Sequence, residues 1–315
     1  MRIVFMGTPE YAAINLRSLI SAGCQVVGVF TQPDRPKGRG GRIVLSPAKQ
    51  LALQSSIPVF QPKRIRKEGL EDLKALKPDL CVTAAFGQIL SEEILAVPPL
   101  GTVNVHASLL PKFRGSSPAN WAIIKGETVT GVTTMMTDKG IDTGDILLQD
   151  EVAIQPDETA GELTIRLAHA GAALLQKTLI LLEAGNCPRA RQNEADMTYY
   201  PLLTKKTGEI KWQQPAAVIV NLIRGVNPWP GASTLSPWSQ LKILSAQAEQ
   251  TDSEAASGTI LVSDARRGLL VKTGDGALRI NLLQMPGGKA MDSRDFLRGH
   301  PLDTPGMMNN EEVKP

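Results

Sequence analysis

The segment TVNVHASLLPKFRG, residues 102–115, carries the side chains best suited to chemistry. It begins with an apolar strand pattern in which Asn104 and His106 are two residues apart, so both side chains lie on one face. An amide and an imidazole placed side by side can hydrogen-bond the negative oxygen that develops during acyl transfer. Histidine also exchanges protons near neutral pH. The pair indicates acyl transfer, the alternative being a strand-end histidine held by backbone groups alone.

A carboxylate near this pair would complete the chemistry, because an attacking ammonium must lose a proton and the imidazole must be held in a useful charge state. The loop DKGIDTGD, residues 138–145, offers Asp138, Asp142 and Asp145. Asp and Gly are also common in turns for conformational reasons alone. The residues by themselves leave the choice among the three aspartates open.

Alternating strands and helices must position these residues. Short β-branched runs predict strands, and the segments between them predict helices. The expected strands are 2–6, 25–30, 59–60, 80–85 and 102–105, and the expected helices are 9–21, 47–54, 67–76 and 91–96. Thr8 is expected to cap the first helix and Pro9 to open it. The alternation predicts a mostly parallel α/β sheet, with Asn104 and His106 at its carboxyl edge, where ligands usually bind.

The pattern changes in the second half of the chain. The runs VTTMMT and ILLQDEVAI predict two antiparallel strands around the aspartate loop, and Thr159 with Glu162 predicts a capping box for a helix ending near Ala184. A helix at 215–225 and strands at 241–246, 258–262, 269–273 and 277–283 indicate a small, OB-like β-barrel. The expected organisation is a catalytic α/β domain over 1–188, a linker over 189–205 and a barrel domain over 206–315.

The charge distribution indicates a polyanionic partner. The net charge is +3, yet residues 31–67 hold nine basic residues and one acidic residue, Asp34, which leaves the rest of the chain at a net −5. Residues 205–298 are also mildly basic, with twelve basic and eight acidic side chains. A basic patch on a mildly acidic body is typical of binding to a phosphate backbone, the alternative being a solvated surface that binds nothing.

Composition argues against several other classes. The opening MGTPE has only Gly7 where a dinucleotide fingerprint requires three spaced glycines, which disfavours a nicotinamide or flavin enzyme. Cys24, Cys81 and Cys187 are far apart, so we expect no metal site and a reducing, cytoplasmic compartment. The chain shows no signal h-region and no run near the ~18 apolar residues that cross a bilayer.

These motifs resemble a known family. The string NVHASLLPKFRG, followed by Pro118, Trp121 and GVTTMMTDKGIDTGD, is similar to the signature of the folate-dependent formyltransferases, whose catalytic domain is Rossmann-like. The resemblance implies that Asn104, His106 and Asp142 are catalytic and that 10-formyltetrahydrofolate is the formyl donor, with no metal. The folate contacts that it implies are Ser108, Leu109, Leu110 and Pro111, together with backbone contacts to the pterin around Ala84, Phe86, Gly87 and Ile89.

The resemblance extends to the methionyl-tRNA formyltransferases. FTQPDRPKGRG, residues 30–40, is similar to their basic loop, and LIRGVNPWPGA, residues 222–232, to part of their C-terminal barrel. This implies formyl transfer to the free amino group of initiator methionyl-tRNA. The charged surfaces give no hint of a large apolar interface, so we also expect a cytoplasmic monomer with no membrane partner. The implied tRNA contacts are Arg35, Lys37, Arg39, Arg42, Lys205 and Lys206. Two alternatives stay open: a formyltransferase acting on an amino sugar or other small amine, and a non-catalytic RNA-binding protein.

Overall fold

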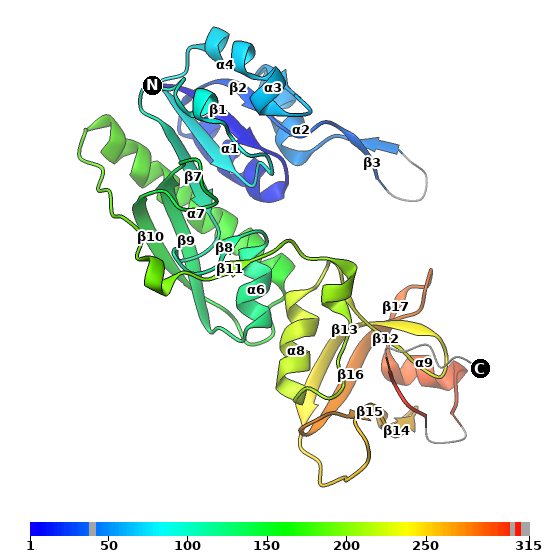
Figure 1. Cartoon of the computed structure of the whole chain (residues 1–315). Helices are drawn as coiled ribbons and strands as arrows, with labels where there is room; N and C mark the ends of the chain where they lie inside the picture. The colour runs from blue at the N-terminus through cyan, green and yellow to red at the C-terminus, as the bar shows by residue number, and fades with distance from the viewer. Residues whose placement is uncertain (38–41, 303–305, 310–315) are drawn as a thin grey trace. The chain divides into compact units, whose positions relative to one another are not determined.

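The computed structural model describes residues 1–37, 42–302 and 306–309, and these form two compact units (Figure 1). The first unit comprises Met1–Pro118, Val129–Ala153 and Leu163–Tyr200. The second comprises Ala119–Thr128, Ile154–Glu162 and the described residues from Pro201 onward. Residues 189–200 of the expected linker are thus grouped with the first unit, and the domain boundaries drawn from the sequence stay a prediction.

The first unit is built on a seven-stranded sheet in the order β10-β9-β7-β6-β1-β2-β5. Five strands are parallel: β1 (Arg2–Gly7), β2 (Gln25–Phe30), β5 (Val59–Phe60), β6 (Leu80–Ala84) and β7 (Thr102–His106). β9 (Val129–Met136) and β10 (Ile146–Ala153) extend the sheet in antiparallel fashion. The predicted mostly parallel α/β class is therefore confirmed.

Helices cover both faces of this sheet, which explains why its central strands are rich in apolar residues. On one face, residues of α3 (Ile65–Glu68), α4 (Leu70–Leu76) and α5 (Glu92–Leu95) pack with Val4 and Met6 of β1. α1 (Glu10–Ser21) and α7 (Ala160–Glu183) are joined by the hydrogen bond from Gln176 to the Ser18 hydroxyl. Gly171 of α7 lies close to Val105, so a larger residue there would displace this helix from β7. α2 (Pro47–Gln54) packs beside α1.

α7 is long and apolar enough to cross a bilayer by length and composition. Its Leu167, Leu175 and Thr178 are buried in the first unit, and the Thr178 hydroxyl shares a hydrogen bond with that of Thr134 in β9. The helix therefore serves as a core helix of the sheet. Its predicted capping box is present, since Thr159 and Glu162 exchange hydrogen bonds.

The expected cap at Thr8 is wrong. α1 begins at Glu10, and Pro9 occupies the N-cap position without a side-chain hydrogen bond. The Thr8 hydroxyl instead accepts hydrogen bonds from the backbone N–H of Gln32 at 3.2 Å and from Thr31 at 3.3 Å. Thr8 thus joins β1 to the residues after β2. These partners are distant in the sequence, so no local pattern predicts the contact.

The second unit is a small barrel. Its sheet has the order β12-β13-β16-β15-β14, with β17 paired to β16. The strands are β12 (Ala232–Leu235), β13 (Gln240–Glu249), β14 (Ile260–Asp264), β15 (Gly268–Lys272), β16 (Ala277–Gln284) and β17 (Ala290–Asp292). Residues 306–309 close the ring, because Asn309 pairs with Leu235 of β12 and Met307 with Thr259 before β14.

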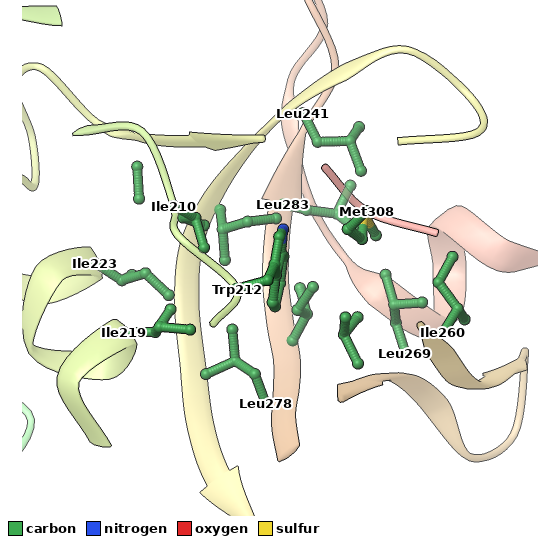
Figure 2. Packing of buried hydrophobic residues seen from close by; sticks show 14 of the residues in the cluster. Ile210, Trp212, Ile219, Ile223, Leu241, Ile260, Leu269, Leu278, Leu283 and Met308 are labelled. Atoms are coloured by element: carbon green, nitrogen blue, oxygen red, sulfur yellow. The ribbon is translucent and has the colours of Figure 1, made fainter. Parts of the chain in front are cut away.

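The barrel encloses its own apolar core (Figure 2). Trp212 lies at its centre, and its indole N–H donates to the Thr234 hydroxyl at 2.9 Å. Ile219 and Ile223 of α8 (Ala216–Gly225) and Phe296 of α9 (Ser293–Gly299) complete the packing. α6 (Pro118–Ile124) is tied to α8 within this unit by the bond from the Asn120 amide to the carbonyl of Gly225 at 2.7 Å.

Candidate active site

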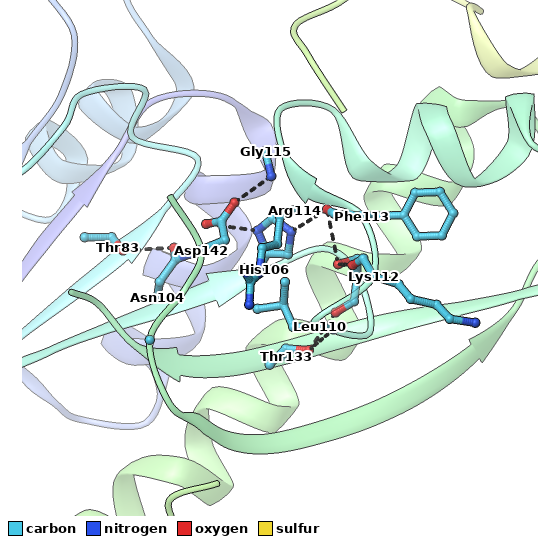
Figure 3. Close-up of polar contacts among 12 residues, drawn as sticks. Thr83, Asn104, His106, Leu110, Lys112, Phe113, Arg114, Gly115, Thr133 and Asp142 are labelled. Carbon is cyan, nitrogen blue, oxygen red and sulfur yellow. Dashed lines mark hydrogen bonds and ion pairs between the residues drawn. The ribbon is translucent and has the colours of Figure 1, made fainter. Parts of the chain in front are cut away.

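The alternation of β7 divides its residues between two environments. Val103 and Val105 are buried, and Val105 faces α7, whereas Asn104 and His106 point to the opposite face (Figure 3). On that face, the side-chain oxygen Oδ1 of Asn104 accepts a hydrogen bond from the Thr83 hydroxyl at 2.9 Å. This bond fixes the amide so that its donor group, Nδ2, is directed away from β6.

His106 is held from both sides. It is 7% exposed, and its Nε2 lies 3.1 Å from the backbone carbonyl of Phe113. A carbonyl oxygen only accepts hydrogen bonds, so Nε2 carries a proton. Nδ1 faces Oδ1 of Asp142 at 3.6 Å, an ion-pair distance that is too long for a hydrogen bond. A carboxylate is therefore in place beside the second ring nitrogen of His106.

The structure distinguishes the three aspartates of the loop. Asp142 faces His106, and its Oδ2 accepts a hydrogen bond from the backbone N–H of Gly115 at 2.8 Å. Asp138 is exposed and accepts bonds from Gly140 and Thr143 within its own turn. The backbone carbonyl of Asp145 bonds Met136 at the mouth of the loop. Asp142 alone of these three is brought to the imidazole.

The segment proposed for folate is held by residues that the sequence did not indicate. Thr133 of β9 donates to the Ser108 carbonyl at 2.6 Å, and the Leu110 N–H donates back to Thr133 at 3.2 Å. The Gln149 amide of β10 donates to the Leu110 carbonyl at 2.9 Å. Ser108 is buried and donates to the Lys112 carbonyl at 2.7 Å. The sequence contained one signal for this support, which is the polar side chain of Thr133 on a buried strand.

The other residues expected at the folate site lie where the chain leaves β6. Ala84 and Phe86 are buried, and Phe86 belongs to the core with Met6. Gly87 and Ile89 are exposed. The expected folate residues Leu109 and Pro111 are half-buried. β6 and β7 are adjacent parallel strands, so both expected folate segments follow the same edge of the sheet.

The residues expected to contact tRNA fall in both units. Arg35 is exposed on β3 (Arg35–Lys37), which pairs with β4 (Arg42–Val44) in an antiparallel hairpin of the first unit. The backbones of Lys37 and Arg42 are paired in this hairpin, and Arg39 lies outside the described residues. Lys205 and Lys206 are exposed on the short helix η2 (Lys205–Gly208) of the second unit.

Asp34, the acidic residue of the basic segment, is neutralised at the base of the hairpin. It accepts hydrogen bonds from Lys49 and Gln61. The bond from Lys49 holds the pKa of Asp34 below its ordinary value. Its negative charge is thus paired inside the unit rather than presented beside Arg35.

Comparisons with known proteins identify the family of this chain. Residues 1–179 match the family described as formyl transferase, and residues 202–301 match its C-terminal domain. The chain is 47% identical over 302 residues to methionyl-tRNA formyltransferase of Caldanaerobacter subterraneus subsp. tengcongensis, covering 95% of this chain and 97% of the relative. It is 46% identical over 306 residues to that of Ruminiclostridium cellulolyticum, covering 96% and 98%.

A solved structure shows the same fold at lower identity. The N-formyltransferase from Helicobacter canadensis, in complex with folinic acid and dTDP-3-aminofucose, superposes with a TM-score of 0.65 at 20% identity. The match covers 88% of this chain and 97% of that chain. The two matched domains and the relatives at nearly full length place the chain in the formyl transferase family, where it groups with the methionyl-tRNA formyltransferases.

Proposed function

We propose that this protein transfers the formyl group of 10-formyltetrahydrofolate to the free amino group of initiator methionyl-tRNA, for translation initiation. Similarity to methionyl-tRNA formyltransferases over 95% of the chain or more supports the reaction and both substrates. The observation that carries the proposal is the convergence of Asn104, His106 and Asp142 at the carboxyl edge of β7. We further propose that it acts as a monomer in the cytoplasm, and its three free cysteines fit a reducing compartment.

Asn104 and His106 stabilise the negative oxygen in the proposed reaction. The amine nitrogen bonds to the formyl carbon, and the formyl oxygen then carries negative charge. The attacking nitrogen loses a proton, the departing folate nitrogen gains one, and the bond from the formyl carbon to the folate nitrogen breaks. The Asn104 amide is turned with its donor group away from Thr83 and is the donor to this oxygen. In the protonated form, His106 adds a positive charge. Because His106 is nearly buried, the attraction between this charge and the negative oxygen is stronger than it would be in water.

Asp142 has two tasks in the proposed reaction. Its carboxylate, 3.6 Å from Nδ1, holds the imidazole of His106 oriented. It also takes the proton that the attacking ammonium loses, directly or through a water. The hydrogen bond from the Gly115 N–H keeps its other oxygen oriented during both tasks.

The substrates are proposed to bind through different kinds of surface. The folate contacts the loop after β6, where Gly87 and Ile89 are exposed, and the segment 108–111. The tRNA contacts the basic hairpin and the lysines of η2. Arg35, Lys205 and Lys206 are exposed, as phosphate-binding side chains must be. These contacts stand as part of the proposal.

One assay tests the reaction directly. The protein is incubated with 10-formyltetrahydrofolate labelled in the formyl group and with initiator methionyl-tRNA, and the label on the aminoacyl group is measured. Uncharged initiator tRNA is the control without an amine, and a nucleotide-linked amino sugar is the competing acceptor. Label on methionyl-tRNA alone supports the proposal. Label on the amino sugar alone, or RNA binding with no transfer, would overturn it in favour of an alternative.

A further inference from the structure

The tip of the loop that carries Asp142 receives little support from packing. Lys139, Gly140 and Ile141 are exposed. A cavity of about 360 Å³ adjoins the loop and is lined by loop residues and by Arg191, Gln192 and Glu194. Asp142 itself has a φ of +54°, in the left-handed region that non-glycine residues seldom occupy. A strained residue beside a cavity needs specific bonds to keep its position.

Gln192 supplies these bonds to the backbone of the loop. Its amide nitrogen donates to the carbonyl of Asp142 and to the carbonyl of Gly144, each at 2.8 Å. Both hydrogens of the amide are used, and the two bonds hold the backbone before and after residue 143. Gln192 is 5% exposed, so water does not compete strongly for these bonds.

Arg114 sets the orientation of that amide. Its Nε and Nη2 donate to the Gln192 carbonyl oxygen at 3.0 and 2.8 Å, which turns the amide nitrogen toward the loop. Arg114 is 3% exposed, and its guanidinium also makes a two-pronged contact with Glu194. These bonds lower the pKa of Glu194. A buried guanidinium with all these acceptors is a rigid support rather than a mobile charge.

Three consecutive residues connect this support to the site (Figure 3). The Phe113 carbonyl faces Nε2 of His106, Arg114 bonds Gln192, and the Gly115 N–H bonds the Asp142 carboxylate. β8 (Arg114–Gly115) pairs with β11 (Tyr199–Tyr200). The chain after α7 therefore contacts both the segment 113–115, through β11, and the loop of Asp142, through Gln192.

We propose that Arg114 and Gln192 are positioning residues that set Asp142 against His106. Neither touches the reacting atoms, and both act through the backbone of the 138–145 loop. The segment after α7 therefore belongs to the catalytic apparatus. This inference rests on the proposed function in one respect, the role given there to Asp142.

Gln192→Glu is the sharpest test. The carboxylate still accepts from Arg114, so the buried guanidinium stays paired, but it cannot donate to the carbonyls of Asp142 and Gly144. Because a misplacement of about 1 Å can cost about 10²-fold in rate, kcat should fall about 10- to 100-fold while KM for methionyl-tRNA stays within about twofold. Gln176→Glu is the matched control, since its amide bonds Ser18 on α1, away from the site, and kcat should not change.

A double-mutant comparison separates positioning from general stability. Arg114→Lys keeps the positive charge but loses the paired hydrogen bonds that a guanidinium makes. Because both residues act through the same loop, kcat of the double variant Arg114→Lys/Gln192→Glu should be no lower than that of the worse single variant. Gln192→Glu should likewise cost nothing further in an Asp142→Asn background. Independent losses that multiply in either pair would overturn the inference. Gln192→Met replaces Gln192→Glu should that variant fail to fold.

A measurement without substrate separates this inference from the proposed function. The protein has three histidines, so imidazole NMR signals are assignable by single substitutions. Gln192→Glu should shift the His106 signals and leave those of His169 and His300 in place. Unchanged His106 signals would overturn the inference. If the His106 signals shift but the wild-type protein transfers no formyl group in the assay, the positioning inference is supported and the proposed function is wrong.

Discussion

The carboxyl edge of β7 and the β3–β4 hairpin belong to the same unit, yet they present polar side chains in opposite ways. His106 is nearly buried and Asn104 half-buried, and each has a partner from another strand or loop. Arg35 is exposed, as are the neighbouring apolar residues Ile43 and Val44. Burial strengthens electrostatic contacts and fixes geometry, as chemistry at one atom requires, whereas exposed charges suit a long polyanion.

This contrast predicts that the two regions control different kinetic constants. Groups that act on the developing oxyanion affect the chemical step, so their loss appears in kcat. Groups that attract phosphates affect binding, so their loss appears in KM and in its dependence on salt. The following changes test that separation.

The largest effect is expected from the β7 edge. Asn104→Ala or His106→Ala should lower kcat by about 10²–10³-fold, the usual cost of one oxyanion donor, with KM for methionyl-tRNA little changed. Steady-state kinetics measures both constants, and circular dichroism checks the fold. His169→Ala, an exposed histidine of α7, is the control. Turnover near that of the wild type in either variant would remove the residue from the catalytic set.

A smaller effect is expected from the hairpin. Replacing Arg35, Lys37, Arg39 and Arg42 by Ala should raise KM for methionyl-tRNA about tenfold or more at moderate salt. The same change should flatten the salt dependence of KM by about one unit of slope for each phosphate that is no longer bound. Neither kcat nor folate binding should change. The control removes two exposed charges elsewhere, by Lys177→Ala and Arg189→Ala. An unchanged KM would indicate a small-molecule acceptor.

The smallest effect is expected from η2 in the second unit. Lys205→Ala with Lys206→Ala removes two charges instead of four, so KM for methionyl-tRNA should rise only a few-fold and the salt slope should fall by about two units at most. Titrating KM against salt measures both. Lys289→Ala, also exposed in the second unit, is the matched control. A drop in kcat with an unchanged salt slope would contradict a phosphate-binding role.

Local patterns were sufficient for most of the fold. The β-branched runs of β1, β2, β6 and β7 and the capping box at Thr159 are short-range signals, and the structure follows them. At two places the structure was decided by a distant partner. Thr8 bonds residues after β2 instead of capping α1, and residues 306–309 close the barrel from the far end of the chain.

For the site, the sequence by itself determined that Asn104 and His106 share a face at the end of a strand, because a strand has a period of two. Motif resemblance then selected Asp142. The tertiary structure alone decided what holds these residues: the Thr83 bond to Asn104, the Phe113 carbonyl at His106, and Arg114 with Gln192 behind the loop. Such supports join segments up to 78 residues apart, as Arg114 and Gln192 show, and hydrogen bonds over that separation leave no periodic trace in the chain.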